Sequence, residues 1–323
     1  MSQEIEFSRI EPQDTPRLHE LALKNDGNGS LTPENFDHWY FRNPSKSNSL
    51  WKVVCNGETE GYATTNNFKY VIEGKEYLIA LPQNVLTSEK VRGGGLFGKL
   101  YYLTEKDNLE EKGVDMFLTS TGAMSTDIFL KKFGYVRGFL PSVLVKFASP
   151  RALFSRGNFS LIQDVNSLSF ETDYQIENAR IKNMEYLKWR YSQCNKKVLR
   201  VISVSVKNEI IGYAFLIVRK MYGLPTLMLA DMICKREENI ADLIDACHVF
   251  ATRNMFAAVI MFELNYNCRR RGINVTMKNH LNFLSKGKTP EETKWLSTRK
   301  LNYFFGDLDF SGNKKSFKTH PSR

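Results

Sequence analysis

The sequence contains a weak internal repeat with an offset of about 150 residues, which restricts the possible folds more than any other feature. The segments WKVVCNGETEGYA (51–63) and LRVISVSVKNEIIGYA (199–214) both end in Gly-Tyr-Ala, and each follows a tryptophan at nearly the same distance. Asn56-Gly57 is a strong hairpin-turn signal, and Lys207-Asn208 fills the corresponding place in the second copy. We therefore predict two related domains, each containing a β-hairpin.

After each hairpin, the apolar pattern predicts strand, helix, strand, helix. This order favours an α/β (α+β layered) fold in which each copy has a mixed central sheet flanked by helices. In the first copy the expected elements are strand 77–86, helix 95–112, strand 116–119 and helix 125–132. In the second copy they are strand 226–233, helix 239–253, strand 257–263 and a basic helix ending near Gly272.

The length of 323 residues, with 42% hydrophobic content, is sufficient for two cores. Segment 148–165 mixes Pro, Gly, Ser and basic residues, as domain linkers do. We therefore expect a first domain at 1–150 and a second at 151–310. Residues 311–323 lack apolar periodicity and are expected to form a basic flexible tail.

The basic excess lies in the second half of the chain. Residues 1–150 contain 17 Lys/Arg and 19 Asp/Glu, whereas 151–323 contain 28 and 16, so an anionic partner is expected mainly with the second half. The five cysteines never form a CxxC pair, which indicates neither a disulfide framework nor a zinc site. No apolar run reaches the length of a membrane span. We expect a cytoplasmic protein with no membrane partner.

A glycine-rich turn, Arg92-Gly93-Gly94-Gly95, follows an apolar strand and opens an amphipathic helix. Glycines let backbone N–H groups turn toward a ligand, and the helix start adds partial positive charge, so this arrangement can hold a diphosphate without a metal. The spacing does not match GxxxxGK[ST], because Lys99 is followed by Leu100.

Arg92-x-x-Gly95, its preceding strand and the later IFLKKFGY (128–135) together resemble the acyl-CoA signature of the GNAT N-acyltransferase superfamily. The resemblance covers nearly the whole chain and implies two tandem GNAT-like domains with acyl-CoA as co-substrate and no metal. It implies that the residues that bind the acyl-CoA are Val85, Leu86, Thr87, Arg92, Gly93, Gly94, Gly95, Leu96, Phe97 and Gly98. The equivalent loop of the second copy, CKREENIADL (234–243), has no glycine. The second domain is therefore expected to shape the acceptor site instead of binding CoA.

The tandem plan, closing with NYFFGDLD (302–309), resembles N-acyltransferases that modify nucleotide-linked amino sugars of the dTDP-3-amino-3,6-dideoxyhexose type. This implies transfer of an acetyl or 3-hydroxybutanoyl group to the sugar amine for lipopolysaccharide biosynthesis, by a monomer or a dimer. Asp307 and Asp309 are expected to bind the substrate by accepting hydrogen bonds from sugar hydroxyls, with a turn role as the alternative.

Two positions depart from the family pattern. Asn84 stands where related sequences often carry Asp, and Leu130 where a catalytic Tyr is often found. Either another segment supplies a base, or a neutral amine attacks through positioning alone; we favour the second. Asn84 would then hold the amine and Ser125 would donate to the departing thiolate, unless these residues serve only as a strand-end polar residue and a helix N-cap. Glu60, next to the hairpin glycine, could act as a distant base, but we expect it to be an outward-facing strand acid.

Two other functions fit parts of the sequence. A tRNA-dependent aminoacyl transferase also uses tandem GNAT-like halves and would use the basic second half. It would not need the CoA-type loop, so a nucleic-acid partner is not expected. The missing Asp and Tyr would also suit a non-catalytic CoA-binding module.

Overall fold

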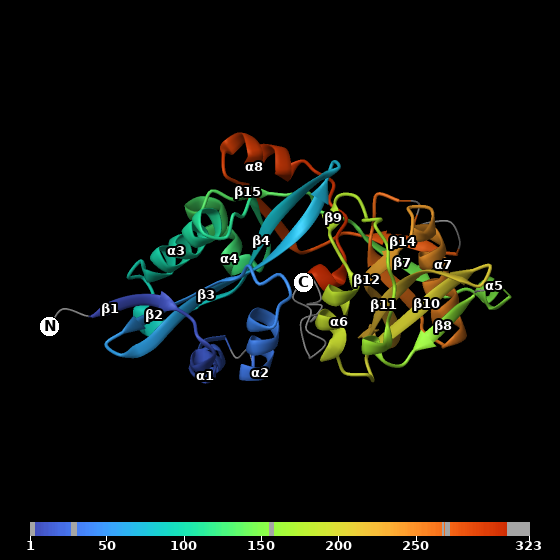
Figure 1. The fold of residues 1–323 in the computed structure, drawn as a ribbon, viewed down its shortest axis with the longest axis horizontal. Helices are drawn as coiled ribbons and strands as arrows, with labels where there is room; N and C mark the ends of the chain where they lie inside the picture. The colour runs from blue at the N-terminus through green and yellow to red at the C-terminus, as the bar shows by residue number, and fades with distance from the viewer. Residues whose placement is uncertain (1–3, 27–30, 155–157, 267, 269–271, 309–323) are drawn as a thin grey trace. The chain divides into compact units, whose positions relative to one another are not determined.

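The computed structural model describes residues 4–26, 31–154, 158–266, 268 and 272–308, and the chain forms two compact units. The first unit takes the chain up to Tyr70 together with Glu76–Phe139 and Leu281–Arg299. The second takes Val71–Lys75, Leu140–His280 and the chain from Lys300. Each unit contains a mixed sheet and packed helices, which is the layered α/β class predicted from the sequence (Figure 1).

In the first unit the sheet has the order β1-β2-β3-β4-β5-β15-β6, and α3 packs against β2. Leu96 and Leu100 of α3 enter a core with Val53 and Ala63, which explains the apolar face of this helix. The elements of this unit are β1 (Ile5–Arg9), η1 (Pro12–Asp14), α1 (Thr15–Asp26), α2 (Pro33–Phe36), η2 (Asp37–Phe41), β2 (Ser49–Cys55), β3 (Glu58–Ile72), β4 (Lys75–Thr87), η3 (Glu89–Val91), α3 (Leu96–Glu110), β5 (Met116–Thr121), α4 (Ala123–Lys132), β6 (Val136–Arg137), β15 (Asn282–Gly287) and α8 (Pro290–Ser297).

In the second unit the sheet has the order β14-β7-β13-β12-β11-β10-β8, and α7 packs on the strands β10 to β13. The buried face of α7 is mainly apolar and shares one large core with the sheet. The elements are β7 (Val143–Phe147), α5 (Pro150–Leu153), β8 (Phe159–Ile162), η4 (Val165–Ser167), β9 (Ala179–Arg180), α6 (Met184–Ser192), β10 (Leu199–Val206), β11 (Glu209–Met221), β12 (Leu224–Cys234), α7 (Asn239–Arg253), β13 (Ala258–Phe262), β14 (Asn274–Met277) and η5 (Phe305–Asp307).

Both predicted hairpins are confirmed, as β2–β3 and β10–β11. Asn56 and Gly57 have φ values of 50° and 79°, and Lys207 and Asn208 have 50° and 66°. Two consecutive residues with positive φ match the twist of the flanking strands, as in a type I′ turn. Each hairpin also carries a β-bulge directly before its Gly-Tyr-Ala, so the repeat extends to local irregularities.

The glycine of each Gly-Tyr-Ala is required by a close backbone approach. A Cβ on Gly61 would lie 2.9 Å from the carbonyl oxygen of Leu86, on β4. A Cβ on Gly212 would clash with the carbonyl oxygen of Ile233, on β12. The repeated tripeptide therefore fixes how closely the second hairpin strand meets the next strand in both units.

One expectation for the C-terminal third was wrong, and a second falls largely outside the described residues. The basic residues 269–271 of the helix expected to end near Gly272 are not among those that the structure describes, and the described residues between β13 and β14 form no helix. Residues 281–299, expected in the second domain, instead belong to the first unit, because β15 pairs with β5 along its whole length and with β6. The boundary between the units falls between Phe139 and Leu140, somewhat before the expected 150.

Across the described ranges, no helix combines the length and the hydropathy that crossing a membrane requires. Asp309 and the expected tail at 311–323 lie outside the described residues.

Candidate functional site

The predicted cofactor residues lie on one continuous strand-turn-helix segment of the first unit. Val85, Leu86 and Thr87 end β4, and Leu96, Phe97 and Gly98 form the first turn of α3. Between them lie η3 and the exposed glycine turn, Arg92–Gly95. We refer to the glycine turn together with the first turn of α3 as the phosphate cradle.

The backbone of the glycine turn adopts conformations that favour glycine. Gly93 and Gly95 have φ values of 87° and 76°, in the left-handed region. A Cβ on either residue would meet nothing within 4 Å, so the need for glycine here is conformational. Gly94 has no such backbone restriction, and its Cβ would come no closer than 3.5 Å to the nearest atom, the carbonyl oxygen of Val91.

The cradle presents backbone donors without acceptors. Gly95 is the N-cap of α3 and provides no side-chain cap, and the first intrahelical bond is from Lys99 N–H to Gly95 O at 3.1 Å. Within the described chain, the N–H groups of Leu96, Phe97 and Gly98 therefore have no partner, and no acidic residue lies in this first turn. Such a helix start attracts a phosphate group.

The end of β4 next to the cradle is partly exposed, although it is a central strand. Residues 79–82 are buried and residues 83–86 are partly exposed. Parallel pairing of β4 with β5 is limited to Ile79 with Met116 and Ala80 with Phe117. Pro82 follows without an N–H group, and Asn84 has a φ of 49°, so the strand cannot continue a regular ladder. Regular backbone pairing of the two strands therefore ends before the predicted thioester position.

Ser125 lies in the first turn of α4, after the neighbouring strand β5. The N-cap of this helix is Gly122, so the alternative reading of Ser125 as the N-cap is wrong. Its hydroxyl donates to the carbonyl oxygen of Gly122 at 3.2 Å, and the side chain is partly exposed. The catalytic role of Ser125 remains a prediction. To donate to a thiolate, the Ser125 hydroxyl would first have to break its hydrogen bond to the Gly122 carbonyl.

Glu60 is buried, contrary to the expectation of an outward-facing acid. It is the extra residue of the β-bulge in β3, which turns its side chain toward the end of β4. Its carboxylate accepts a hydrogen bond from the Ser88 hydroxyl, and its backbone oxygen accepts one from Ser88 N–H at 2.7 Å. Lys90 lies 3.4 Å from the same carboxylate. Glu60 therefore anchors the segment between β4 and the glycine turn.

Asp307 lies in the second unit, with its side chain 2% exposed. The carboxylate is 3.4 Å from Arg180 and 3.2 Å from Lys182, and it also caps the backbone N–H of Phe304 at 2.8 Å. This burial among fixed partners favours a structural role over the predicted contact with a sugar hydroxyl.

The segment around Asp307 fills the strand separation of the second unit. β12 and β13 pair only at Leu227 with Val259 and Met228 with Ile260, as β4 and β5 do in the first unit. Beyond this point the ring of Phe305 packs on Phe262 of β13 at 4.3 Å between centroids. A Cβ on Gly306 would clash with the carboxylate of Asp231 on β12, so the C-terminal segment (301–308) lies between the two strands.

No protein-family model and no curated protein matches the sequence. Solved structures do match, and three of them have TM-scores from 0.62 to 0.64. One is a conserved protein from Enterococcus faecalis V583 described as a probable N-acyltransferase, with 10% identity over 89% of this chain and 73% of that chain (TM-score 0.64).

The others are GCN5-related N-acetyltransferases. The one from Kribbella flavida has 12% identity over 88% of this chain and 71% of that chain (TM-score 0.63). The one from Anabaena variabilis has 9% identity over 87% and 72% (TM-score 0.62). At these identities the likeness shows the fold: the chain has the fold of the GCN5-related N-acetyltransferases and covers most of it, consistent with the two tandem units.

Proposed function

We propose that this protein is an acyl-CoA-dependent N-acyltransferase. The observation that carries the proposal is the phosphate cradle, with its unpartnered N–H groups directly after a partly exposed strand end. The N–H groups of Leu96, Phe97 and Gly98 would bind the CoA diphosphate, and the dipole of α3 would favour its charge. The names of the structurally similar N-acetyltransferases support the same reaction class.

The acyl group would lie along the partly exposed end of β4. Backbone N–H groups near Leu86 would polarise the thioester carbonyl, and the acceptor amine would attack in its neutral form. A carbon–nitrogen bond forms and the carbon–sulfur bond breaks, and the amine proton released is taken up by the departing thiolate, directly or through Ser125. No carboxylate is assigned as a base, because Asn84 occupies the strand position where an acid would act.

The proposed acceptor is a nucleotide-linked amino sugar, of the dTDP-3-amino-3,6-dideoxyhexose type, and the proposed acyl group is acetyl or 3-hydroxybutanoyl. The side chains joined around the end of β4 are neutral hydrogen-bonding groups. The amide of Asn43 donates to Asn66 at 3.0 Å, and Asn66 donates to Gln83 at 2.9 Å. Amides of this kind both donate to and accept from sugar hydroxyls.

The first test is thiol release from acetyl-CoA and 3-hydroxybutanoyl-CoA with a panel of dTDP- and UDP-linked amino sugars, with products read by mass. We expect release with one of these sugars. Measurable CoA binding without release for any of them would exclude the amino-sugar acceptor and leave another amine or a binding module.

Gly94→Glu tests the cradle itself. A carboxylate there would repel the diphosphate, so we expect acetyl-CoA affinity to fall on the order of a hundredfold or more in calorimetry. Gly94→Ala is the matched control, because its Cβ fits in ordinary contact with Val91 and should leave affinity within about threefold. Equal affinities for the two variants would overturn the assignment. If an aminoacyl-tRNA binds instead, both variants should leave that binding unchanged.

A further inference from the structure

The side chain of Asn84 is held by a tyrosine that the sequence did not single out. Asn84 Nδ2 donates to the hydroxyl of Tyr40 at 2.7 Å. Tyr40 belongs to η2, is 4% exposed and packs its ring against Phe36 at 4.6 Å between centroids. A rigid, buried ring therefore places this hydroxyl beside the partly exposed end of β4.

Thr64 and Tyr40 have one hydroxyl proton each, and this determines which end of the Asn84 amide faces Tyr40. The hydroxyl of Thr64, which is fully buried, lies 2.8 Å from the Tyr40 hydroxyl and 2.5 Å from the Gln83 carbonyl oxygen. The carbonyl can only accept, so Thr64 donates to it and Tyr40 donates to Thr64. Tyr40 must then accept from Asn84, which turns Nδ2 toward Tyr40 and leaves Oδ1 as an acceptor with no partner among the described residues.

The second unit contains the same pair. Tyr40 and Tyr191 each precede the glycine of Gly-Tyr-Ala by 21 residues. Asn84 and Asp231 each lie two residues before the carbonyl that faces that glycine. In the second unit the Tyr191 hydroxyl donates to the Asp231 carboxylate, so the contact is repeated in both copies.

In the second unit this pair is covered by the chain itself. A Cβ on Gly306 would clash with Asp231 and would come within 2.5 Å of the Tyr191 hydroxyl, so the backbone of Gly306 lies directly against both. The Tyr191–Asp231 pair therefore faces a position occupied by a compact, polar group, the Gly306 backbone. The equivalent Tyr40–Asn84 pair in the first unit faces a position that such a group can occupy.

We infer that Tyr40 is a positioning residue, which holds Asn84 so that its Oδ1 accepts an N–H from the acceptor amine and aims the nitrogen lone pair at the thioester. This inference rests on the proposed function. An amide oxygen suits the task because it binds the neutral amine, whereas a carboxylate would favour the unreactive ammonium form. The presence of Asn in place of Asp at residue 84 is then part of the mechanism.

Tyr40→Phe tests the inference, with Tyr191→Phe as the matched control in the second unit. We expect Tyr40→Phe to raise the KM for the amine about tenfold, with the KM for acyl-CoA unchanged. Tyr191→Phe should leave both constants unchanged. Asn84→Asp should shift the midpoint of the pH–rate profile upward, which a merely structural role for residue 84 would not do. Unchanged amine KM in Tyr40→Phe, in a wild type that is active, would overturn the inference.

A second measurement does not depend on activity. In ¹⁵N spectra of the full chain, the side-chain NH₂ signal of Asn84 is identified by its loss in Asn84→Ser. We expect this signal to shift in Tyr40→Phe and in Thr64→Val, and to stay in place in Thr104→Val, a buried threonine whose hydroxyl donates to the Leu100 carbonyl elsewhere in the first unit. An Asn84 signal that shifts in neither variant would refute the fixed orientation of the Asn84 amide. Absence of acyl transfer by the wild type would count against the proposed function alone.

Discussion

Asn84 combines a backbone role with a side-chain role. Its φ of 49° lies in the left-handed region, which asparagine adopts more readily than most residues. Asn84→Gly would keep this backbone and lose the amide, whereas Asn84→Asp would keep the shape and add charge. Comparing the two variants therefore separates the path of β4 from the chemistry at its end.

His248 provides a residue-level prediction of pH-dependent stability in the second unit. Burial lowers its pKa below the ordinary value of 6.5, although the hydrogen bond to the Phe147 carbonyl at 2.8 Å opposes this. Lys146 and Asp245 are the charged groups that also act on it. Because the unfolded chain takes up a proton first, we expect stability to fall as the pH drops from 6.5 through the folded pKa.

For this one proton the slope cannot exceed about 1.4 kcal/mol per pH unit. Urea unfolding between about pH 7.5 and 5 measures it, with His248→Gln as the variant that cannot titrate. A wild-type minus variant difference that stays constant over this range would contradict the prediction.

At the level of single residues, the glycines of the phosphate cradle could be predicted from the sequence, but the partner of Asn84 could not. The cradle glycines could be predicted, because a glycine turn that opens a helix is a local pattern. Tyr40 could not, because its contact with Asn84 crosses 44 residues and depends on the bulges that set how β3 meets β4. The only signal was in the repeat: Tyr40 and Tyr191 occupy equivalent places, but the intervals from Trp39 and Trp189 differ by one residue.

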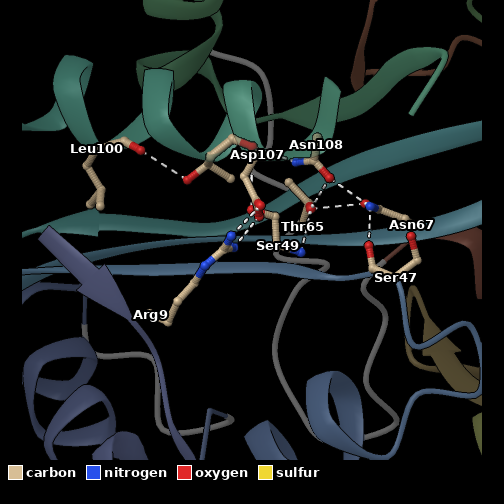
Figure 2. Close-up of polar contacts among 9 residues, drawn as sticks. Arg9, Ser47, Ser49, Thr65, Asn67, Leu100, Asp107 and Asn108 are labelled. Atoms are coloured by element: carbon tan, nitrogen blue, oxygen red, sulfur yellow. Dashed lines mark hydrogen bonds and ion pairs between the residues drawn. The ribbon is translucent and has the colours of Figure 1, made fainter. Parts of the chain in front are cut away.

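The helix α3 has an unusually polar buried face behind its phosphate-binding start. Thr104, Asp107 and Asn108 are all buried, and Figure 2 shows how Asp107 and Asn108 meet residues of the strands beneath. Burial alone would raise the pKa of Asp107, but the Arg9 guanidinium, which pairs with both carboxylate oxygens, holds it below its ordinary value. Directional contacts of this kind fix the rotation of α3 about its axis. They thereby fix the direction in which the N–H groups of its first turn point.

Asn108 is the centre of this polar face. Its Oδ1 accepts from Asn67 at 2.7 Å and lies 3.2 Å from the Thr65 hydroxyl (Figure 2). Its Nδ2 donates to the Thr104 carbonyl at 2.8 Å. Asn108→Leu would leave buried donors unpaired, so we expect the free energy of unfolding to fall by about 2–4 kcal/mol in urea titrations.

Lys106→Ala, on the exposed face of the same helix, is the control and should change stability by no more than about 0.5 kcal/mol. Similar losses in Asn108→Leu and Lys106→Ala would show that the buried network does not hold α3 in place.

Elements with strong local signals were predictable, and those defined by distant pairing were not. The helix expected at 239–253 is α7 with the same bounds, and α3 differs from its expected range by two residues or fewer at either end. In contrast, β14 and β15 are short strands whose partners β7 and β5 lie far back in the sequence. Their pattern does not show which unit each would join.

The whole molecule is not two successive domains, because the chain returns to the first unit near its end. Residues Asn282–Gly287 pair with β5 from Thr121 back to Met116, and only then does the chain enter the second unit again at Lys300. The strand β15 separates β5 from β6 in the sheet order, so the first sheet is incomplete without it.

We therefore expect a chain truncated after His280 to lose acyl-CoA binding, although it keeps every residue of the cradle. The edge of β5 would be left unpaired, which favours aggregation. Yield of soluble protein and calorimetry with acetyl-CoA measure both effects.

The matched control is the full chain with a protease site inserted after His280, an exposed residue in a loop, and cleaved after folding. The cut protein should retain CoA binding, because β15 remains paired. Normal CoA binding by the truncated chain would show that β15 is dispensable for the site.

The late arrival of β15 also sets the order of events during synthesis. A ribosome that has finished Phe139 must still add about 150 residues before Gly287, which at 5–20 residues per second takes roughly 7–30 s. During that interval the nascent first unit has an open sheet edge and cannot close. The first unit therefore cannot complete its sheet until most of the second has been synthesised, and the two halves of the chain could not be exchanged independently for those of a relative without moving this strand as well.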